Sequence, residues 1–151
     1  MVQPQSLVST LAIGSDHGGL ALKHVLFARL RDAGVTVHDF GTDNPASVDY
    51  PDFAHAVCRA VTGGSAERGI LVCGTGIGMS IAANRHPGIR CVLAHDVTTA
   101  RLGREHNDGN VLALGGRILG EELAWDIVAT FLATRFDGGR HERRLAKLTP
   151  A

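Results

Sequence analysis

Short runs of branched and aliphatic residues alternate along this chain with longer segments of helical periodicity, and this alternation constrains the fold more than any other feature. Leu7–Ile13 predicts a strand, and Leu20–Ala33 predicts a helix because Leu22, Leu26 and Leu30 recur at four-residue spacing. Strands that are apolar on both faces belong to a parallel sheet covered by helices. We therefore expect an α/β fold, a three-layer α/β/α sandwich with a five-stranded parallel sheet of Rossmann-like type. Further strands are predicted at Val35–Phe40, Gly69–Cys73, Ile89–Ala94 and Asn110–Leu114, and further helices from Pro51 to Thr62, from the turn at Gly74–Gly78 to Asn84, from Asp96 to Glu105 and from Glu121 to Thr134.

Length and charge exclude several classes of protein. The 151 residues suit one domain, residues 1–151, with residues 1–10 as an N-terminal extension and start of the first strand and residues 138–151 as a basic C-terminal tail. Because 15 Lys+Arg balance 15 Asp+Glu and aromatic residues make up only 5%, we expect no nucleic-acid partner. No apolar run approaches the roughly 18 residues of a membrane span, and Met1–Thr10 lacks the pattern of a signal peptide.

The cysteines indicate a reducing compartment. Cys58, Cys73 and Cys91 are an odd number and form no CxxC pair, so we expect neither a disulfide framework nor a location outside the cytoplasm. Despite eight histidines the chain has no HExxH and no paired ligands at helical spacing, so we expect no metal.

The glycine-rich loop from Cys73 to Ser80 is the strongest chemical feature. Glycines let a backbone approach a ligand and turn successive N–H groups toward an anion, whereas the simpler interpretation is a tight strand-to-helix turn that binds nothing. A dinucleotide site is disfavoured because Met79 stands where GxGxxG has its last glycine, and the Walker lysine is absent.

Other candidates follow predicted strands, because ligands of such sheets bind beyond the carboxyl ends of the strands. They are Asp16 and His17 after the first strand, Cys73 after the third, and His95 and Asp96 after the fourth. A cysteine at the head of a helix is favoured as a thiolate, which acts as a nucleophile or as a base. Asp16 and Asp96 are equally explained as helix caps, and Cys58 and Cys91 as small buried residues.

Two further clusters have both a structural and a functional interpretation. His106-Asn107-Asp108 is expected in a loop on the same side as the glycine loop, where a histidine is a surface residue, a helix C-cap or part of a site. Arg140, His141, Arg143 and Arg144 form either a solvated terminus or a phosphate-binding cluster, for which the planar arginine fork is suited.

Taken in order, these motifs resemble the ribose-5-phosphate isomerase B family, which also contains allose- and galactose-6-phosphate isomerases. The resemblance runs from about Leu11 to Leu148. It is carried by Gly14-Ser15-Asp16-His17-Gly18-Gly19, Asp49-Tyr50-Pro51, Cys73-Gly74-Thr75-Gly76-Ile77-Gly78, Ile81-Ala82-Ala83-Asn84-Arg85, Arg104-Glu105-His106-Asn107-Asp108 and Gly138-Gly139-Arg140-His141.

The resemblance implies a cofactor-free aldose–ketose isomerase of the pentose phosphate pathway, which interconverts D-ribose 5-phosphate and D-ribulose 5-phosphate through an enediolate. It also implies a homodimer or tetramer with each active site at a subunit interface. Cys73 is the implied general base, since Met79 stands where a subgroup of the family has a glutamate base. Its other implied site residues are Thr75 at the reacting end, backbone N–H groups from Gly74, Gly76, Ile77 and Gly78 at the enediolate oxygen, His106 for ring opening, Asp16 and Asn107 for hydroxyls, and His17, Arg117, Arg140 and Arg144 for the phosphate.

Two other functions stay open at this point. One is a hexose-6-phosphate isomerase for allose or galactose. The other is a non-catalytic phosphosugar-binding protein, although a protein that only binds has no need of Cys73, Thr75 and His106 together.

Overall fold

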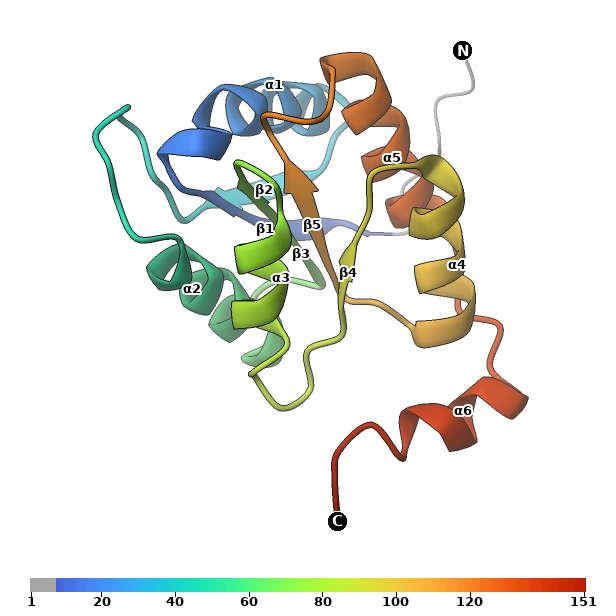
Figure 1. Cartoon of the computed structure of the whole chain (residues 1–151). Helices are drawn as coiled ribbons and strands as arrows, with labels where there is room; N and C mark the ends of the chain where they lie inside the picture. The colour runs from blue at the N-terminus through green and yellow to red at the C-terminus, as the bar shows by residue number, and fades with distance from the viewer. Residues whose placement is uncertain (1–7) are drawn as a thin grey trace.

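The computed structural model describes residues 8–151, and its five strands form one parallel sheet (Figure 1). The predicted parallel α/β architecture is confirmed. The spatial order is β2-β1-β3-β5-β4, so β3 lies in the centre and the two strands on each side of it are exchanged relative to the chain order. The strands are β1 (Thr10–Ser15), β2 (Thr36–Asp39), β3 (Arg68–Cys73), β4 (Cys91–Leu93) and β5 (Val111–Gly115).

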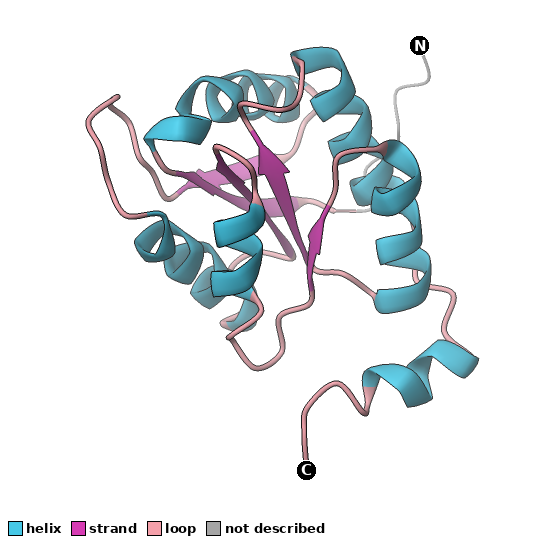
Figure 2. Cartoon of the chain, viewed as in Figure 1, coloured by secondary structure: helices cyan, strands magenta, loops and turns pink. Residues whose placement is uncertain are grey.

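Helices cover both faces of the sheet, which gives the three predicted layers (Figure 2). The helices are η1 (His17–Gly19), α1 (Leu20–Asp32), α2 (Tyr50–Thr62), α3 (Ile77–Ala83), α4 (Val97–Asn107), α5 (Glu121–Ala133) and α6 (Arg140–Leu145). One apolar cluster packs α1, α4 and α5 against the sheet, and a second packs α2 and α3 against the other face. Within residues 8–151, no helix is both long enough and apolar enough to cross a bilayer.

Alternation along the central strand decides which layer each side chain enters. Ile70 and Val72 of β3 belong to the α1–α4–α5 cluster, whereas Leu71 and Cys73 belong to the α2–α3 cluster. This is the two-residue period of an extended strand. It places Cys73 on the side of the sheet from which α3 departs.

Local signals in the sequence set several helix ends. Gly34 follows α1 with φ +86°, as expected for a glycine that ends a helix. Pro51 lies in the first turn of α2, where its missing N–H breaks no helical hydrogen bond. The Asp96 carboxylate caps α4, with Oδ1 accepting from the Thr99 N–H at 2.7 Å, and this bond lowers the pKa of Asp96.

Two strands and the C-terminal tail depart from their predicted structure. β1 continues to Ser15, two residues beyond the predicted end at Ile13, while Leu7 and the rest of residues 1–7 lie outside the described residues. β4 is shorter than the predicted Ile89–Ala94. The predicted basic tail contains α6, because His141 is buried against the end of α4 and fixes a helical turn there.

Candidate active site

The loop between β3 and α3 reverses the chain in three residues, and Gly76 makes this possible. Gly76 has φ +79°, and a Cβ added there would lie 2.8 Å from Leu93 Cδ1 and 2.9 Å from the carbonyl carbon of Leu114. Only glycine combines this left-handed conformation with so close an approach to neighbouring strands. The loop is thereby pressed against the carboxyl ends of β4 and β5.

The Cys73 sulfur lies directly under this loop. Its residue is 5% exposed and belongs to the apolar α2–α3 cluster, but Sγ accepts a hydrogen bond from the Gly76 N–H at 3.1 Å. This bond fixes the position of the sulfur beneath the glycine loop.

Three backbone amides of the loop remain available to a ligand. Gly76 donates to Cys73, and the Ile77 N–H donates to Thr75 Oγ1 at 3.2 Å, so two of the predicted anion-binding amides have partners within the chain. In the part of the chain that the structure describes, the N–H groups of Gly74, Thr75 and Gly78 have no acceptor. Fewer backbone amides of the glycine loop are therefore available to an anion than the sequence predicts.

The loop after β1 packs against the glycine loop, because β1 and β3 are neighbours. A Cβ added at Gly18 would lie 3.1 Å from the Gly74 amide nitrogen. Asp16 Oδ1 accepts hydrogen bonds from the Gly18 and Gly19 N–H groups at 2.9 and 3.1 Å, so its expected capping role is confirmed. His17 Nδ1 accepts from the Val48 N–H at 3.2 Å, which leaves its other ring nitrogen as a donor.

Arg117 and Tyr50 also lie against the glycine loop. The Arg117 N–H donates to the Gly74 carbonyl at 3.0 Å, and its guanidinium lies 3.3 Å from where a Cβ on Gly74 would be. The Tyr50 ring lies over Gly78, at a spot that any side chain on residue 78 would fill. His95 Nε2 lies 3.1 Å from the Thr75 carbonyl oxygen, with which it forms a hydrogen bond. No role was predicted for Tyr50, although it belongs to the Asp49-Tyr50-Pro51 motif that carries the family resemblance.

His106 and Asn107 lie at the opposite edge of the sheet, so their expected place beside the glycine loop is wrong. α4 begins just past the carboxyl end of β4 and runs back for 11 residues, about 16 Å. Its end therefore reaches the amino edge of the sheet. There Arg90, the residue before β4, donates from Nε to the Asn107 carbonyl at 3.1 Å.

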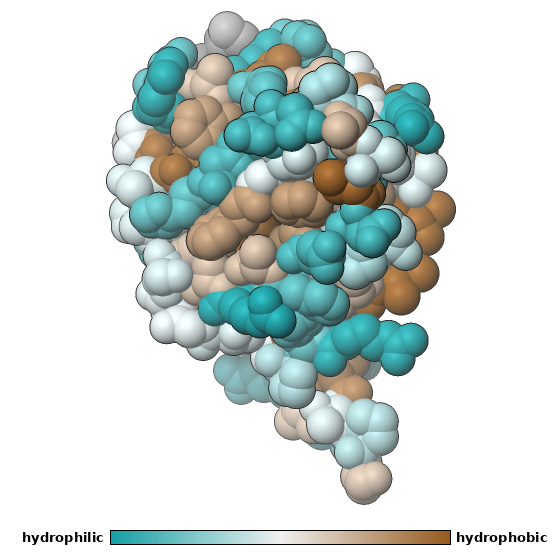
Figure 3. Space-filling view, turned by 90° about the vertical axis from the view of Figure 1, so that its left-hand side faces the viewer, coloured by the Kyte–Doolittle hydropathy of each residue, from teal (hydrophilic) through white to brown (hydrophobic). Residues whose placement is uncertain are grey.

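α6 lies at the same amino edge as His106. The His141 and His106 rings are stacked, with centroids 4.5 Å apart and planes 16° apart. Arg140 and Arg144 are exposed on α6, which stands away from the body of the molecule, as does the chain end in Figures 1 and 3. The candidate residues therefore form two groups at opposite edges of one chain.

Cys58 and Cys91 have surroundings that keep their thiols protonated. Burial raises the pKa of Cys58 to about 11. Burial, and then the neighbouring Cys58, raise the pKa of Cys91. The prediction of a small buried residue is confirmed for Cys58, whereas Cys91 is only half-buried, and of the three cysteines Cys73 is the one that adjoins the glycine loop.

Comparisons with known proteins point to the family that the sequence motifs resemble. The family model described as Ribose/Galactose Isomerase matches residues 11–148. Ribose-5-phosphate isomerase B of Escherichia coli is 48% identical over 139 residues, which cover 92% of this chain and 93% of that protein. The structure of Clostridium thermocellum ribose-5-phosphate isomerase B superposes with a TM-score of 0.91 at 52% identity, covering 92% of this chain and 94% of that one. The corresponding Thermotoga maritima enzyme gives the same TM-score, 0.91, and identity, 52%, over 92% of this chain and 96% of the other.

Proposed function

This chain belongs to the ribose/galactose isomerase family, and from that premise we propose that it interconverts D-ribose 5-phosphate and D-ribulose 5-phosphate through an enediolate. No cofactor takes part in the proposed reaction. We place it in the cytoplasm, a location that the three free thiols support.

Cys73 is the proposed general base. As a thiolate it takes the proton from C2 of the open-chain aldose, the C2 electrons form the C1–C2 double bond, and O1 becomes negative. The proton of the C2 hydroxyl then passes to O1, so that O1 becomes the C1 hydroxyl and the negative charge moves to O2. The same sulfur returns its proton to C1 as the C2–O bond becomes the ketone and the C1–C2 double bond is lost. The Gly76 N–H, 3.1 Å from Sγ, holds the sulfur in position for both transfers.

The free amides of the glycine loop are placed to stabilise the enediolate. Gly74, Thr75 and Gly78 offer N–H groups in the turn that follows Cys73, and Thr75 adds an exposed hydroxyl. Removing one such donor in an enzyme typically costs about 3–4 kcal/mol of transition-state stabilisation. His17 and Arg117, on the neighbouring loops, supply a ring N–H and a guanidinium to hydroxyl or phosphate oxygens.

His106 is the proposed acid–base group for opening the furanose ring, and it acts in the site of a second copy of the chain. Within one chain it lies at the amino edge of the sheet and Cys73 at the carboxyl edge. In a two-fold homodimer in which the amino edge of one copy meets the carboxyl edge of the other, the symmetry repeats this contact and so forms two such sites. Asn107, Arg140 and Arg144 travel with His106 and would bind the sugar hydroxyls and the phosphate of that same site.

The surface beside the glycine loop supports this assembly. Ile77 and Ile81 lie one turn apart on α3 and are 49% and 56% exposed. Two large aliphatic side chains in adjacent turns favour contact with another protein surface over water. We therefore propose a homodimer in which α3 lies at the interface.

One observation carries the proposal: in a chain of this family, the group around Cys73 and the group around His106 lie at opposite edges of the sheet. Its first test is to incubate the purified chain with D-ribose 5-phosphate alone and to measure ketose formation. Turnover without added cofactor is expected. Binding of the sugar phosphate without ketose would show a binding protein instead. A higher kcat/KM for allose or galactose 6-phosphate than for ribose 5-phosphate would move the assignment to a six-carbon substrate.

A further inference from the structure

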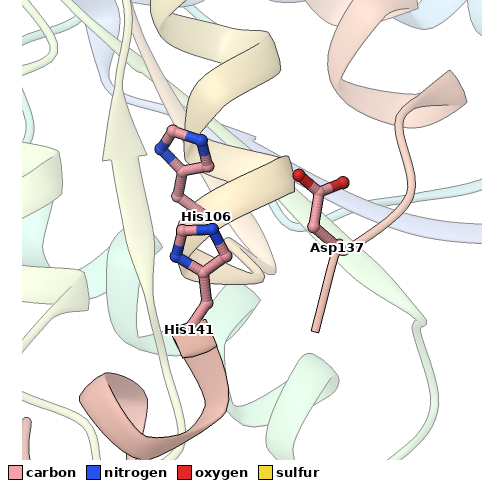
Figure 4. Close-up of side chains that lie close together, drawn as sticks. All are labelled: His106, Asp137 and His141. Atoms are coloured by element: carbon pink, nitrogen blue, oxygen red, sulfur yellow. The ribbon is translucent and has the colours of Figure 1, made fainter. Parts of the chain in front are cut away.

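Two imidazoles and one carboxylate converge where α4, the segment after α5 and α6 meet. We propose that His106, Asp137 and His141 form a binding site for one divalent transition-metal ion of the zinc type. One ligand atom from each residue lies within 4.8 Å of those of the other two. Figure 4 shows the two rings one above the other with the Asp137 carboxylate beside them.

The distances require only side-chain movement. Zinc holds imidazole nitrogen and carboxylate oxygen at about 2.0–2.2 Å, so tetrahedral ligand atoms stand about 3.3 Å apart. The atoms must therefore approach by at most about 1.5 Å from their present 4.8 Å limit. His106 is half-buried and Asp137 exposed, so both can turn toward the buried His141.

The backbone that carries the three ligands is already fixed. The Asp137 N–H donates to the Glu105 carbonyl at 3.0 Å, which places residue 137 beside the last turn of α4. Arg104 Nε donates to the Thr134 carbonyl at 3.2 Å and holds the preceding segment against the same helix. Little conformational entropy remains to be lost there, which favours metal binding.

The charges around the site favour a metal that prefers imidazole. The Asp137 carboxylate has no ion-pair or hydrogen-bond partner among residues 8–151. Arg140 and Arg144 lie on the same helix as His141, one residue before it and three residues after it. The same two arginines oppose cations held by charge alone, so Zn²⁺ is favoured over Mg²⁺.

Occupation of this site would control the enzyme. A metal bound through His106 takes the ring that we assign to furanose opening, and this consequence rests on the proposed function. Zinc is then an inhibitor that also ties α6 to α4. The metal site itself does not depend on catalysis.

The direct test is calorimetric titration of the untagged full chain with ZnCl₂ at pH 7.5, with MgCl₂ in a parallel arm. We expect one Zn²⁺ per chain and no heat from Mg²⁺. The variants Asp137→Asn and His141→Gln are expected to weaken zinc binding by roughly 10-fold or more. His86→Gln is the matched control, because His55 and His86 also touch, at 2.6 Å, but belong to no such three-ligand group among the described residues.

Unchanged zinc binding in Asp137→Asn, or no stoichiometric binding by the wild-type chain, would overturn the site. Asp137 is exposed, so its variant folds even where the His141 change disturbs packing. In a parallel activity assay, Zn²⁺ should inhibit the turnover of ribose 5-phosphate by the wild-type chain. The Asp137→Asn variant should have wild-type activity without metal and should not be inhibited by Zn²⁺. Zinc bound without inhibition would support the site and remove His106 from ring opening. If the chain shows no isomerase activity, the proposed function is wrong but the metal site is not, because calorimetry tests zinc binding independently of catalysis.

Discussion

At the scale of single residues, two side chains divide the proposed chemistry between them. Cys73 exchanges a proton with carbon, which needs a base held rigidly against a flat intermediate. Its burial and its bond from the Gly76 N–H provide that rigidity. His106 exchanges a proton with the ring oxygen, which needs a group that gains and loses a proton near neutral pH, as imidazole does.

Replacing Cys73 by alanine should remove catalysis and leave binding. We expect the Cys73→Ala variant to lose about 10²–10⁴-fold in kcat, because general base catalysis contributes on that scale. Equilibrium titration with ribose 5-phosphate should show an unchanged Kd. Cys91→Ala is the control and should keep full activity, since its thiol stays protonated. Comparable losses in both variants would remove the special role of Cys73.

Replacing His106 by alanine should discriminate between closed and open substrates. D-Erythrose 4-phosphate cannot close a furanose ring, because its terminal oxygen carries the phosphate. The His106→Ala variant should therefore lose much more activity on D-ribose 5-phosphate than on D-erythrose 4-phosphate. Steady-state assays of the wild-type chain and of His106→Ala on each of the two sugar phosphates give the two losses to be compared. Equal losses on the two sugars would contradict the ring-opening assignment.

At the scale of helices and strands, the sequence predicted the parallel sheet and the glycine loop because their signals are local. Apolar runs mark the strands, and Gly34, Pro51 and Asp96 mark helix ends. The exchange of β4 and β5 depends on packing between distant segments, so no local pattern contains it. α6 and the group of His106, Asp137 and His141 escaped prediction for the same reason, since His106 lies more than thirty positions before the residues that it contacts.

Gly76 should be the most sensitive glycine of the loop. Gly76→Ala forces a side chain into φ +79° and within 2.9 Å of the Leu114 carbonyl carbon. We expect a loss of about 1–3 kcal/mol in the free energy of unfolding, measured by urea denaturation. Gly34→Ala separates strain from contact, because Gly34 has φ +86° but nothing within 4 Å of an added Cβ. A loss at Gly76 no larger than at Gly34 would show that contact with β5 is unimportant.

The contact between His55 of α2 and His86, which follows α3, should make the free energy of unfolding depend on pH. Burial, then His55 and Arg59, lower the pKa of His86 below its ordinary value of 6.5. The unfolded chain therefore binds this proton more readily, so the contribution is complete above about pH 6.5 and is lost as pH falls below it. Urea denaturation at pH 7.5 and 5.5 should show a smaller drop for His86→Gln than for the wild-type chain. The exposed His38→Gln variant should match the wild-type chain, and a drop unchanged by His86→Gln would contradict the linkage.

At the scale of the whole molecule, the direction of α4 decides how many chains make one site. A helix that starts at the carboxyl edge must end at the amino edge, so the eleven residues of α4 carry His106 away from Cys73. From the order of the elements along the chain, Cys73 and His106 were both predicted on the side of the glycine loop. The length and direction of α4 show instead that they lie at opposite edges of the sheet.

Mixing two inactive variants tests this division of the site between copies. In a dimer of one Cys73→Ala chain and one His106→Ala chain, one site contains both substitutions and the other contains both native residues. Random exchange makes about half of the dimers mixed, so an equal mixture should reach about one quarter of wild-type activity on ribose 5-phosphate. The chains are unfolded together in urea, refolded by dilution and assayed, with each variant refolded alone as the control. Activity no greater than the sum of the separate variants would mean that each site is built from one chain, and His106 would then have no route to the substrate.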